Sequence, residues 1–110
     1  MRAEEPLGSP GAKLETVVIL AFTEGPVYAE DGSVYFTDIV NNRIMRLKPG
    51  SGGGVFSGGP EVFRAPAGCA AGLAFDLQGR LLAAEDNGDG GNRRVTRTEK
   101  DGTITVLADH

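Results

Sequence analysis

The sequence offers few residues for cross-linking or for metal binding by nitrogen and sulfur. It has one cysteine, no tryptophan and one histidine, which is the last residue, His110. A single cysteine cannot form an internal disulfide, and without a Cys/His cluster no structural zinc site is available. The serines lack a histidine partner, so a Ser-His-Asp triad is excluded. We interpret Cys69, in an Ala/Gly-rich stretch, as a small buried apolar residue.

The sequence also lacks a basic charge excess and a long apolar run. Its formal net charge is −4, which gives no long-range attraction for nucleic acid or for anionic lipid. No apolar run approaches the roughly 20 residues of a membrane span, and the N-terminus has no signal-peptide pattern. We therefore expect no nucleic-acid partner, no membrane partner and a cytoplasmic location.

Glycine and proline are abundant, with 17 and 6 of the 110 residues. Short apolar segments alternate with turn signals, and none keeps a helical period over three turns, which predicts an all-β fold. Residues 1–14 have the composition of a disordered N-terminal tail. The β-branched run at residues 16–22 (TVVILAF) predicts a strand buried on both faces.

The rest of the chain contains two copies of one pattern. Residues 25–32 match residues 72–79 at an offset of 47, and residues 43–46 match residues 94–97 at an offset of 51. A repeat of about 40–50 residues with four short strands is typical of a β-propeller blade. The sequence therefore predicts blades at residues 24–63 and 72–107.

Two blades are fewer than the four to eight that close a propeller. We therefore expect residues 15–110 to be the N-terminal part of a larger propeller, with residues 16–22 as an orphan strand. Open sheet edges and an uncovered apolar face favour self-association of such a chain.

The ordered motifs of both copies resemble the SMP-30/gluconolactonase/LRE-like family. The residues that carry the resemblance are 24–28 (EGPVY), 31–38 (DGSVYFTD), 42–46 (NRIMR), 72–76 (GLAFD), 79–82 (GRLL), 93–98 (RRVTRT) and 101–109 (DGTITVLAD). No single motif is specific for this family, but the order and spacing of all the motifs together are specific for it. The resemblance covers about residues 16–110 and implies a six-bladed propeller.

The resemblance implies a metal-dependent hydrolase that opens sugar lactones such as gluconolactone. The glutamate that opens the family's first blade ligates the metal, and here it corresponds to Glu24. The family's other ligands and its acid/base residue lie in later blades, so no catalytic residue is assigned in this chain. Ca²⁺ is the expected cofactor, with Zn²⁺, Mg²⁺ or Mn²⁺ as alternatives. The other interpretation is a non-catalytic propeller fragment or a binding module.

Other charged residues are open to structural interpretations. Without the resemblance, Glu24 would be read as a solvated loop residue. Asp38 and Glu85 occupy equivalent repeat positions, and we expect them to tie loops to neighbouring strands. Residues 86–92 have the oxygen ligands and glycines of a calcium loop but lack its position-12 glutamate, so a surface loop is favoured. The arginines at residues 93–97 interleave with acidic residues and are expected to form a solvated face.

Overall fold

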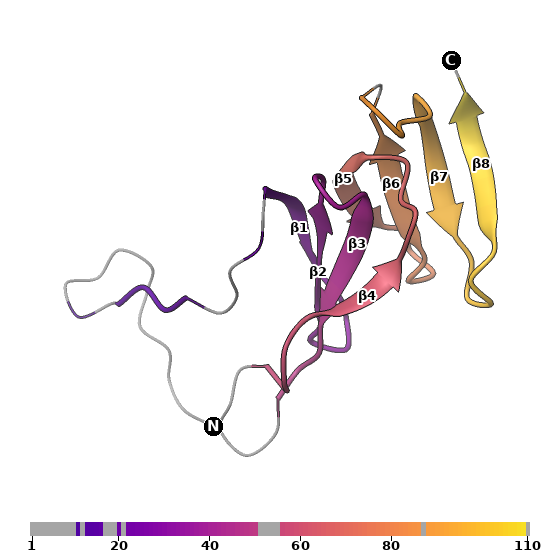
Figure 1. Ribbon diagram of the computed structural model, residues 1–110. Coiled ribbons are helices and arrows are strands. Elements are labelled where there is room, and N and C mark those ends of the chain that lie inside the picture. Colours follow the sequence, from indigo (N-terminus) through magenta and orange to yellow (C-terminus); the bar gives the residue numbers. More distant parts are fainter. Residues whose placement is uncertain are drawn as a thin grey trace.

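A computed structural model describes residues 11, 13–16, 20, 22–50, 56–86 and 88–109. In this part of the chain eight strands form two four-stranded antiparallel sheets, and no helix is present (Figure 1). The described residues accordingly include no helix long and apolar enough to cross a membrane. The all-β prediction is confirmed, and the two sheets have the strand content of two propeller blades.

The first sheet has the order β1-β2-β3-β4, and the second has the order β5-β6-β7-β8. The strands are β1 (Thr23–Tyr28), β2 (Val34–Asp38), β3 (Arg43–Leu47), β4 (Glu61–Arg64), β5 (Ala70–Phe75), β6 (Leu81–Glu85), β7 (Arg94–Thr98) and β8 (Ile104–Asp109). Each sheet is a meander in which consecutive strands pair, as short turns between antiparallel strands require.

The turns follow from local sequence. Between β1 and β2, the N–H of Ala29 donates to the carbonyl of Ser33, and the side chain of Asp31 accepts from the N–H of Ser33 at 2.8 Å. Gly32 supplies the left-handed conformation that this turn needs, at φ +90°. Asp76 and Arg80 make the same backbone hydrogen bond in the second sheet, which confirms the repeat at an offset of 47.

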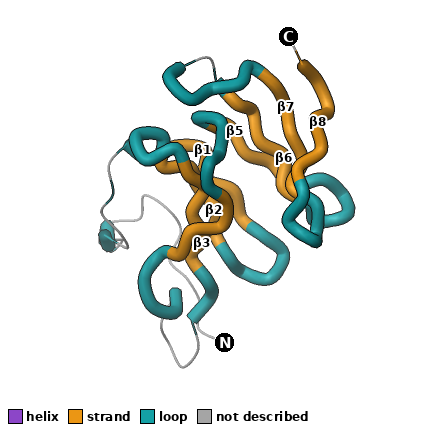
Figure 2. The backbone as a smooth tube through the Cα atoms, turned by 45° about the vertical axis from the view of Figure 1, so that its right-hand side comes forward, coloured by secondary structure: helices purple, strands orange, loops and turns teal. Residues whose placement is uncertain are grey.

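The main core lies between the sheets and is centred on Tyr35. The ring of Tyr35 packs edge-to-face against Phe63 of β4 and Phe75 of β5, with ring centroids 4.9 and 5.3 Å apart. Ile44 and Leu81 are also fully buried in this cluster. Figure 2 shows β1 and β2 lying beside β5, so the blades pack face to face at the ends nearest their first strands.

The two outward faces differ. On the first sheet Phe36, Met45 and Leu47 are buried, with Leu20 and Phe56 packed against them. On the second sheet the face turned away from the first carries exposed Ala84 and Val95. The second sheet therefore has the uncovered apolar face that the sequence led us to expect, and self-association through it stays a prediction.

The run at residues 16–22 does not appear as a strand where the structure describes it. Thr16, Leu20 and Phe22 have no strand conformation, and residues 17–19 and 21 lie outside the described residues, as do residues 1–10 and 12 of the predicted tail. Phe22 has a positive φ of 45°, which breaks an extended strand immediately before β1. The orphan strand stays a prediction for the residues outside the described part, and Phe22 is not in extended conformation.

Candidate functional site

Glu24, the predicted metal ligand, lies near the start of β1. It pairs with Thr37 of β2, and its carbonyl accepts a hydrogen bond from the Thr37 hydroxyl at 3.0 Å. The register then shifts between Glu24 and Val27. This irregularity separates Glu24 from the regular part of β1, and the residue is exposed.

Gly25 fixes the backbone beside Glu24. Its φ is +57°, and a Cβ at this position would collide with the carbonyl oxygen of Ala71 in β5. Only glycine combines this conformation with so close an approach of two backbones. Glu24 is consequently presented where the first strands of the two blades meet.

Glu24 also borders a hollow of about 220 Å³. The other lining residues are Thr23, Pro26, Val34, Phe36 and Leu47. Glu24 is the only one of these residues with a carboxylate side chain, so this wall offers a cation one charged ligand. Hard cations such as Ca²⁺ require six to eight oxygen ligands.

The described residues do not by themselves form a metal site. Nowhere in that part of the chain do three His, Cys, Asp or Glu residues gather as a ligand group. Glu24 can contribute a single carboxylate, and we derive no reaction step through a metal from these residues alone.

Asp38 is held entirely by its own sheet. It is fully buried at the end of β2, and one of its oxygens, Oδ2, accepts from Asn41 at 2.8 Å and from the Nε of Arg43 at 2.9 Å. Burial opposes its ionisation, but the hydrogen bonds from Asn41 and Arg43 outweigh it and lower the pKa of the carboxyl. Its other oxygen, Oδ1, has no hydrogen-bond partner among the described residues.

Glu85, the equivalent residue of the second sheet, is held by both sheets. Its Oε2 accepts from Asn92 at 2.9 Å and from the Nε of Arg94 at 2.7 Å, as in the Asp38 network. Its Oε1 accepts from Arg64 of β4 at 2.6 Å and from Thr96 at 3.1 Å. Burial again opposes ionisation, and the hydrogen bonds from Arg94, Asn92, Arg64 and Thr96 together lower the pKa of Glu85. The expected structural role is therefore present, and it extends across the blade interface.

Asn42 is a structural residue that the sequence reasoning missed. Its side-chain oxygen accepts from the N–H groups of Ala67 and Cys69 at 3.2 and 2.7 Å, which ties the connection between the blades to the first sheet. Its φ is +51°, and Arg93, its equivalent in the second copy, has φ +53°. The Asn-Asn pair in the turn was the available signal, because asparagine tolerates this conformation better than most residues.

The loop at residues 86–92 is tied to the protein at its middle and at both ends. The thiol of buried Cys69 donates to the carbonyl of Asp89, and the Arg93 N–H donates to the carbonyl of Asp86 at 3.1 Å. Asn92 turns inward to Glu85, and Asn87 lies outside the described residues. The surface-loop interpretation fits these contacts, and Cys69 is buried as predicted.

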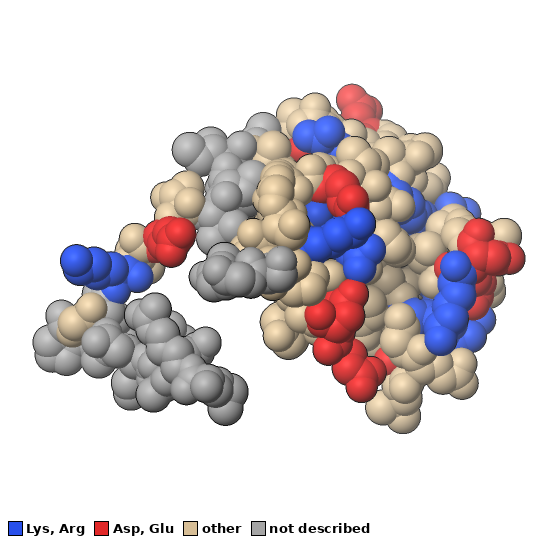
Figure 3. All heavy atoms as spheres, turned by 90° about the horizontal axis from the view of Figure 1, so that it is seen from below, with Lys and Arg blue, Asp and Glu red and all other residues tan. Residues whose placement is uncertain are grey.

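The arginines of β7 form no continuous basic stripe, as the interleaved acidic residues led us to expect. The side chains of Arg94 and Arg97 are 29% and 23% exposed, and each pairs with a glutamate, Glu85 and Glu99 respectively. On the face drawn in Figure 3, positive and negative side chains lie next to one another, without a field of one sign. Arg93 and Lys100 are exposed, as expected of a solvated face, whereas Arg94 and Arg97 are half-buried because each guanidinium pairs with an acid of its own sheet.

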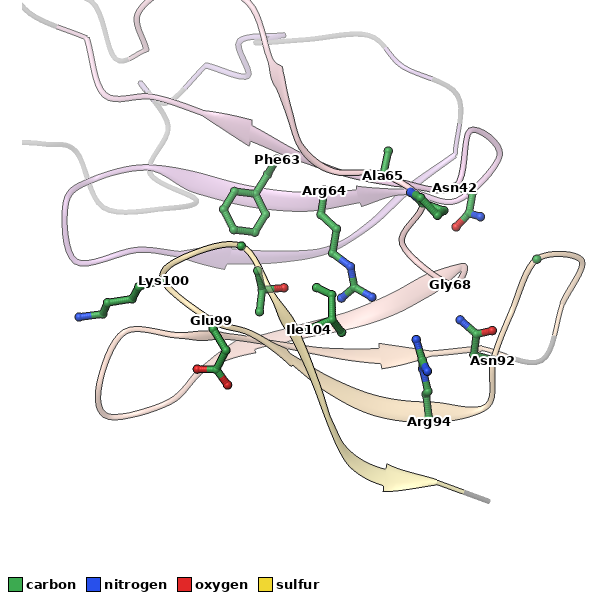
Figure 4. A pocket seen from close by; sticks show the side chains of 14 residues that line it. Asn42, Phe63, Arg64, Ala65, Gly68, Asn92, Arg94, Glu99, Lys100 and Ile104 are labelled. Carbon is green, nitrogen blue, oxygen red and sulfur yellow. The ribbon is translucent and has the colours of Figure 1, made fainter.

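A cleft of about 760 Å³ lies between β4 and the β7–β8 side of the second sheet (Figure 4). Its lining residues are Asn42, Phe63, Arg64, Ala65, Pro66, Gly68, Gly90, Asn92, Arg94, Thr98, Glu99, Lys100, Gly102 and Ile104. Glu24 is not among them, so the cleft and the predicted metal ligand are separate features.

A family model and solved structures both relate this chain to gluconolactonases. The sequence matches the SMP-30/Gluconolactonase/LRE-like region over residues 22–110. A structural-genomics target assigned as a gluconolactonase is 28% identical, with a TM-score of 0.64 over 82% of this chain. Virginiamycin B lyase from Staphylococcus aureus is 25% identical, with a TM-score of 0.52 over 96% of this chain.

A further structure, the gluconolactonase XC5397 from Xanthomonas campestris, shares the fold at 24% identity and a TM-score of 0.65 over 81% of this chain. The chain spans less than a third of these solved structures, covering 28%, 27% and 30% of the structural-genomics target, XC5397 and the lyase. No curated protein sequence gives a significant match.

Proposed function

The chain belongs to the SMP-30/gluconolactonase/LRE-like family, and from this membership we propose that it forms two blades of a metal-dependent sugar lactonase. It is a lactonase-like propeller fragment with two sheets. The proposed substrate is an aldonolactone such as gluconolactone. The observation that carries the proposal is the family match together with Glu24 at the meeting point of the two first strands.

In the proposed enzyme, Glu24 supplies one anionic ligand to a divalent cation, with Ca²⁺ preferred. The cation would polarise the lactone carbonyl and activate water when all its ligands are present. The remaining ligands and the proton acceptor are assigned to blades beyond these two. The tight contact at Gly25 supports the assignment, because it leaves the backbone of Glu24 little freedom to move.

The 110-residue chain should not hydrolyse gluconolactone by itself. Metal-assisted hydrolysis needs a firmly bound cation, an activated water and a group that accepts its proton. A pH-indicator assay with added Ca²⁺, Zn²⁺, Mg²⁺ or Mn²⁺ is expected to give the spontaneous rate. Turnover that EDTA abolishes would show that these two blades assemble a complete site, for example through self-association.

The ligand assignment is tested in a complete propeller that contains these residues. Glu24→Gln should abolish EDTA-sensitive hydrolysis, because the amide lacks the negative charge that anchors the cation. Glu30→Gln is the matched control, since Glu30 is also exposed and lies two residues beyond β1. Unchanged turnover and metal affinity in Glu24→Gln would remove Glu24 from the site.

A further inference from the structure

Two arginines, Arg64 of the first sheet and Arg94 of the second, share one buried carboxylate of the second sheet. Arg64 and Arg94 both bond to Glu85, and the side chains of Arg64 and Glu85 are 9% and 0% exposed. The group carries two positive charges and one negative charge. In the first sheet, Asp38 is paired with Arg43 alone and that group is neutral. The group at the interface thus has one positive charge more than Glu85 balances.

Both arginines line the cleft of about 760 Å³. Arg64 uses its two terminal nitrogens on Thr96 and Glu85, and Arg94 uses its Nε on Glu85. The terminal nitrogens of Arg94 have no acceptor among the described residues, so donors remain for an incoming group. Figure 4 shows the Arg64 side chain reaching down into the cleft from β4 while Arg94 rises from β7.

A buried hydroxyl also borders the cleft without a partner. Thr98 is 7% exposed, and its Oγ1 makes no hydrogen bond within the described part of the chain. Buried hydroxyls normally have a partner, because leaving one unpaired costs free energy. Thr98 lines the cleft, and its hydroxyl can rotate about χ1 without breaking a hydrogen bond.

The neighbouring walls are apolar. Phe63 and Ile104 both line the cleft and are each 38% exposed. Ile104 is the cross-strand partner of Thr98, so the unpaired hydroxyl lies beside the apolar part. Figure 4 shows Phe63 on the β4 side and Ile104 on the β8 side, with the space of the cleft between them.

The cleft's one carboxylate does not cancel the positive end. Glu99 accepts hydrogen bonds from Arg97 at 2.6 Å and from Arg80 at 3.4 Å. Its charge is therefore balanced within its own sheet. In Figure 4 it lies with Lys100 at the end of the cleft away from Arg94.

We propose that this cleft binds an organic anion that has a carboxylate head, an apolar body and a hydroxyl group. The head would bond to the guanidinium groups of Arg64 and Arg94, the body would lie between Phe63 and Ile104, and the hydroxyl would pair with Thr98. Arginine suits the head because its planar fork of donors matches a carboxylate. The site is separate from Glu24 and does not depend on the proposed lactonase activity.

Three probes test this assignment on the 110-residue chain by NMR titration. 4-Hydroxyphenylacetate carries all three features, phenylacetate lacks the hydroxyl, and phenylacetamide lacks the charge. We expect phenylacetate to bind about tenfold more tightly than phenylacetamide, as one charge-assisted hydrogen bond would give. The hydroxylated probe should bind about threefold more tightly still, and Thr98→Val should erase that last difference.

Ile104→Glu and Val106→Glu form a matched pair of variants. Both residues lie on β8 and are exposed, at 38% and 43%, but only Ile104 lines the cleft. Ile104→Glu places a negative charge and a polar group in the cleft and should reduce phenylacetate binding about tenfold or more. Val106→Glu should leave it unchanged, and both should fold because neither residue is buried.

Some results would overturn the proposal. One is equal affinity of the wild-type chain for phenylacetate and phenylacetamide. Another is an equal loss of phenylacetate affinity in Ile104→Glu and Val106→Glu. The third is equal affinity of the wild-type chain for phenylacetate and 4-hydroxyphenylacetate. Self-association through the uncovered face with Ala84 and Val95 leaves the cleft free, because that face and the cleft lie on opposite sides of the second sheet.

Discussion

Asp38 and Glu85 occupy the same position in two copies of one repeat, and the structure uses them differently. Asp38 bonds to Asn41 and Arg43 of its own sheet. Glu85 keeps the equivalent partners and adds Arg64 from the other sheet. Glutamate is one methylene longer than aspartate, which allows its second oxygen to reach across the interface. A carboxylate that anchors a turn in one blade thus joins two blades in the next.

The glycines near the start of each sheet show the same kind of divergence. Gly25 and Gly72 are equivalent at an offset of 47, but only Gly25 has a positive φ and meets a neighbouring backbone. At Gly72 an added Cβ would find only the Cβ of Ala84, at an ordinary contact distance of 3.6 Å. The two copies therefore share the same strand, but the structural role of equivalent residues depends on whether they lie at the interface between the sheets.

The largest effect is expected from Gly25→Ala compared with Gly72→Ala. The first change forces a left-handed alanine against the carbonyl of Ala71 and should cost about 3–4 kcal/mol of unfolding free energy. The second should change stability by no more than about 0.5 kcal/mol, because it meets neither constraint. Urea unfolding followed by circular dichroism measures both. Similar losses of unfolding free energy in the two variants would mean that the close approach of β1 and β5 does not require glycine at position 25.

The sequence predicted the repeat and most strands because those features are local. β3 and β7 contain the matched segments at residues 43–46 and 94–97, since alternating residues and flanking turns specify these strands. It did not predict that Arg64 would pair with Glu85, which lies 21 residues away on another sheet. No pattern within one repeat contains that contact. Phe22 was also missed, because an apolar run does not reveal a residue with positive φ.

Removal of the interface charge should have the next largest effect. Glu85→Gln leaves Arg64 buried without its counter-charge, and breaking such a buried pair costs about 3 kcal/mol. Asp38→Asn should cost about 1–2 kcal/mol, since Arg43 remains partly exposed to water. The comparison is made by denaturant unfolding at neutral pH. A larger loss in Asp38→Asn would contradict the interface role of Glu85.

Acid should weaken the fold through the same groups. The folded protein holds the pKa of Glu85 below its ordinary value of 4.5, and that of Asp38 below 3.8. The unfolded chain therefore binds more protons as the pH falls through this range, so their stabilisation is present above the ordinary values and is lost below them. Glu85→Gln should flatten the stability profile below pH 4.5 more than Asp38→Asn does. Identical slopes in wild type and Glu85→Gln would contradict this account.

The smallest effect on stability is expected at Glu24, where the second sheet has Ala71 in the equivalent position. Glu24 is exposed, and the hydrogen bond that it receives from Thr37 goes to its backbone carbonyl. Glu24→Gln should therefore change the unfolding free energy by less than about 0.5 kcal/mol. The backbone contacts that set its position remain in this variant. A loss of Ca²⁺ binding in the complete propeller without a loss of stability would separate a ligand from a structural residue. A destabilisation comparable to that of Glu85→Gln would instead place Glu24 among the groups that hold the blades together.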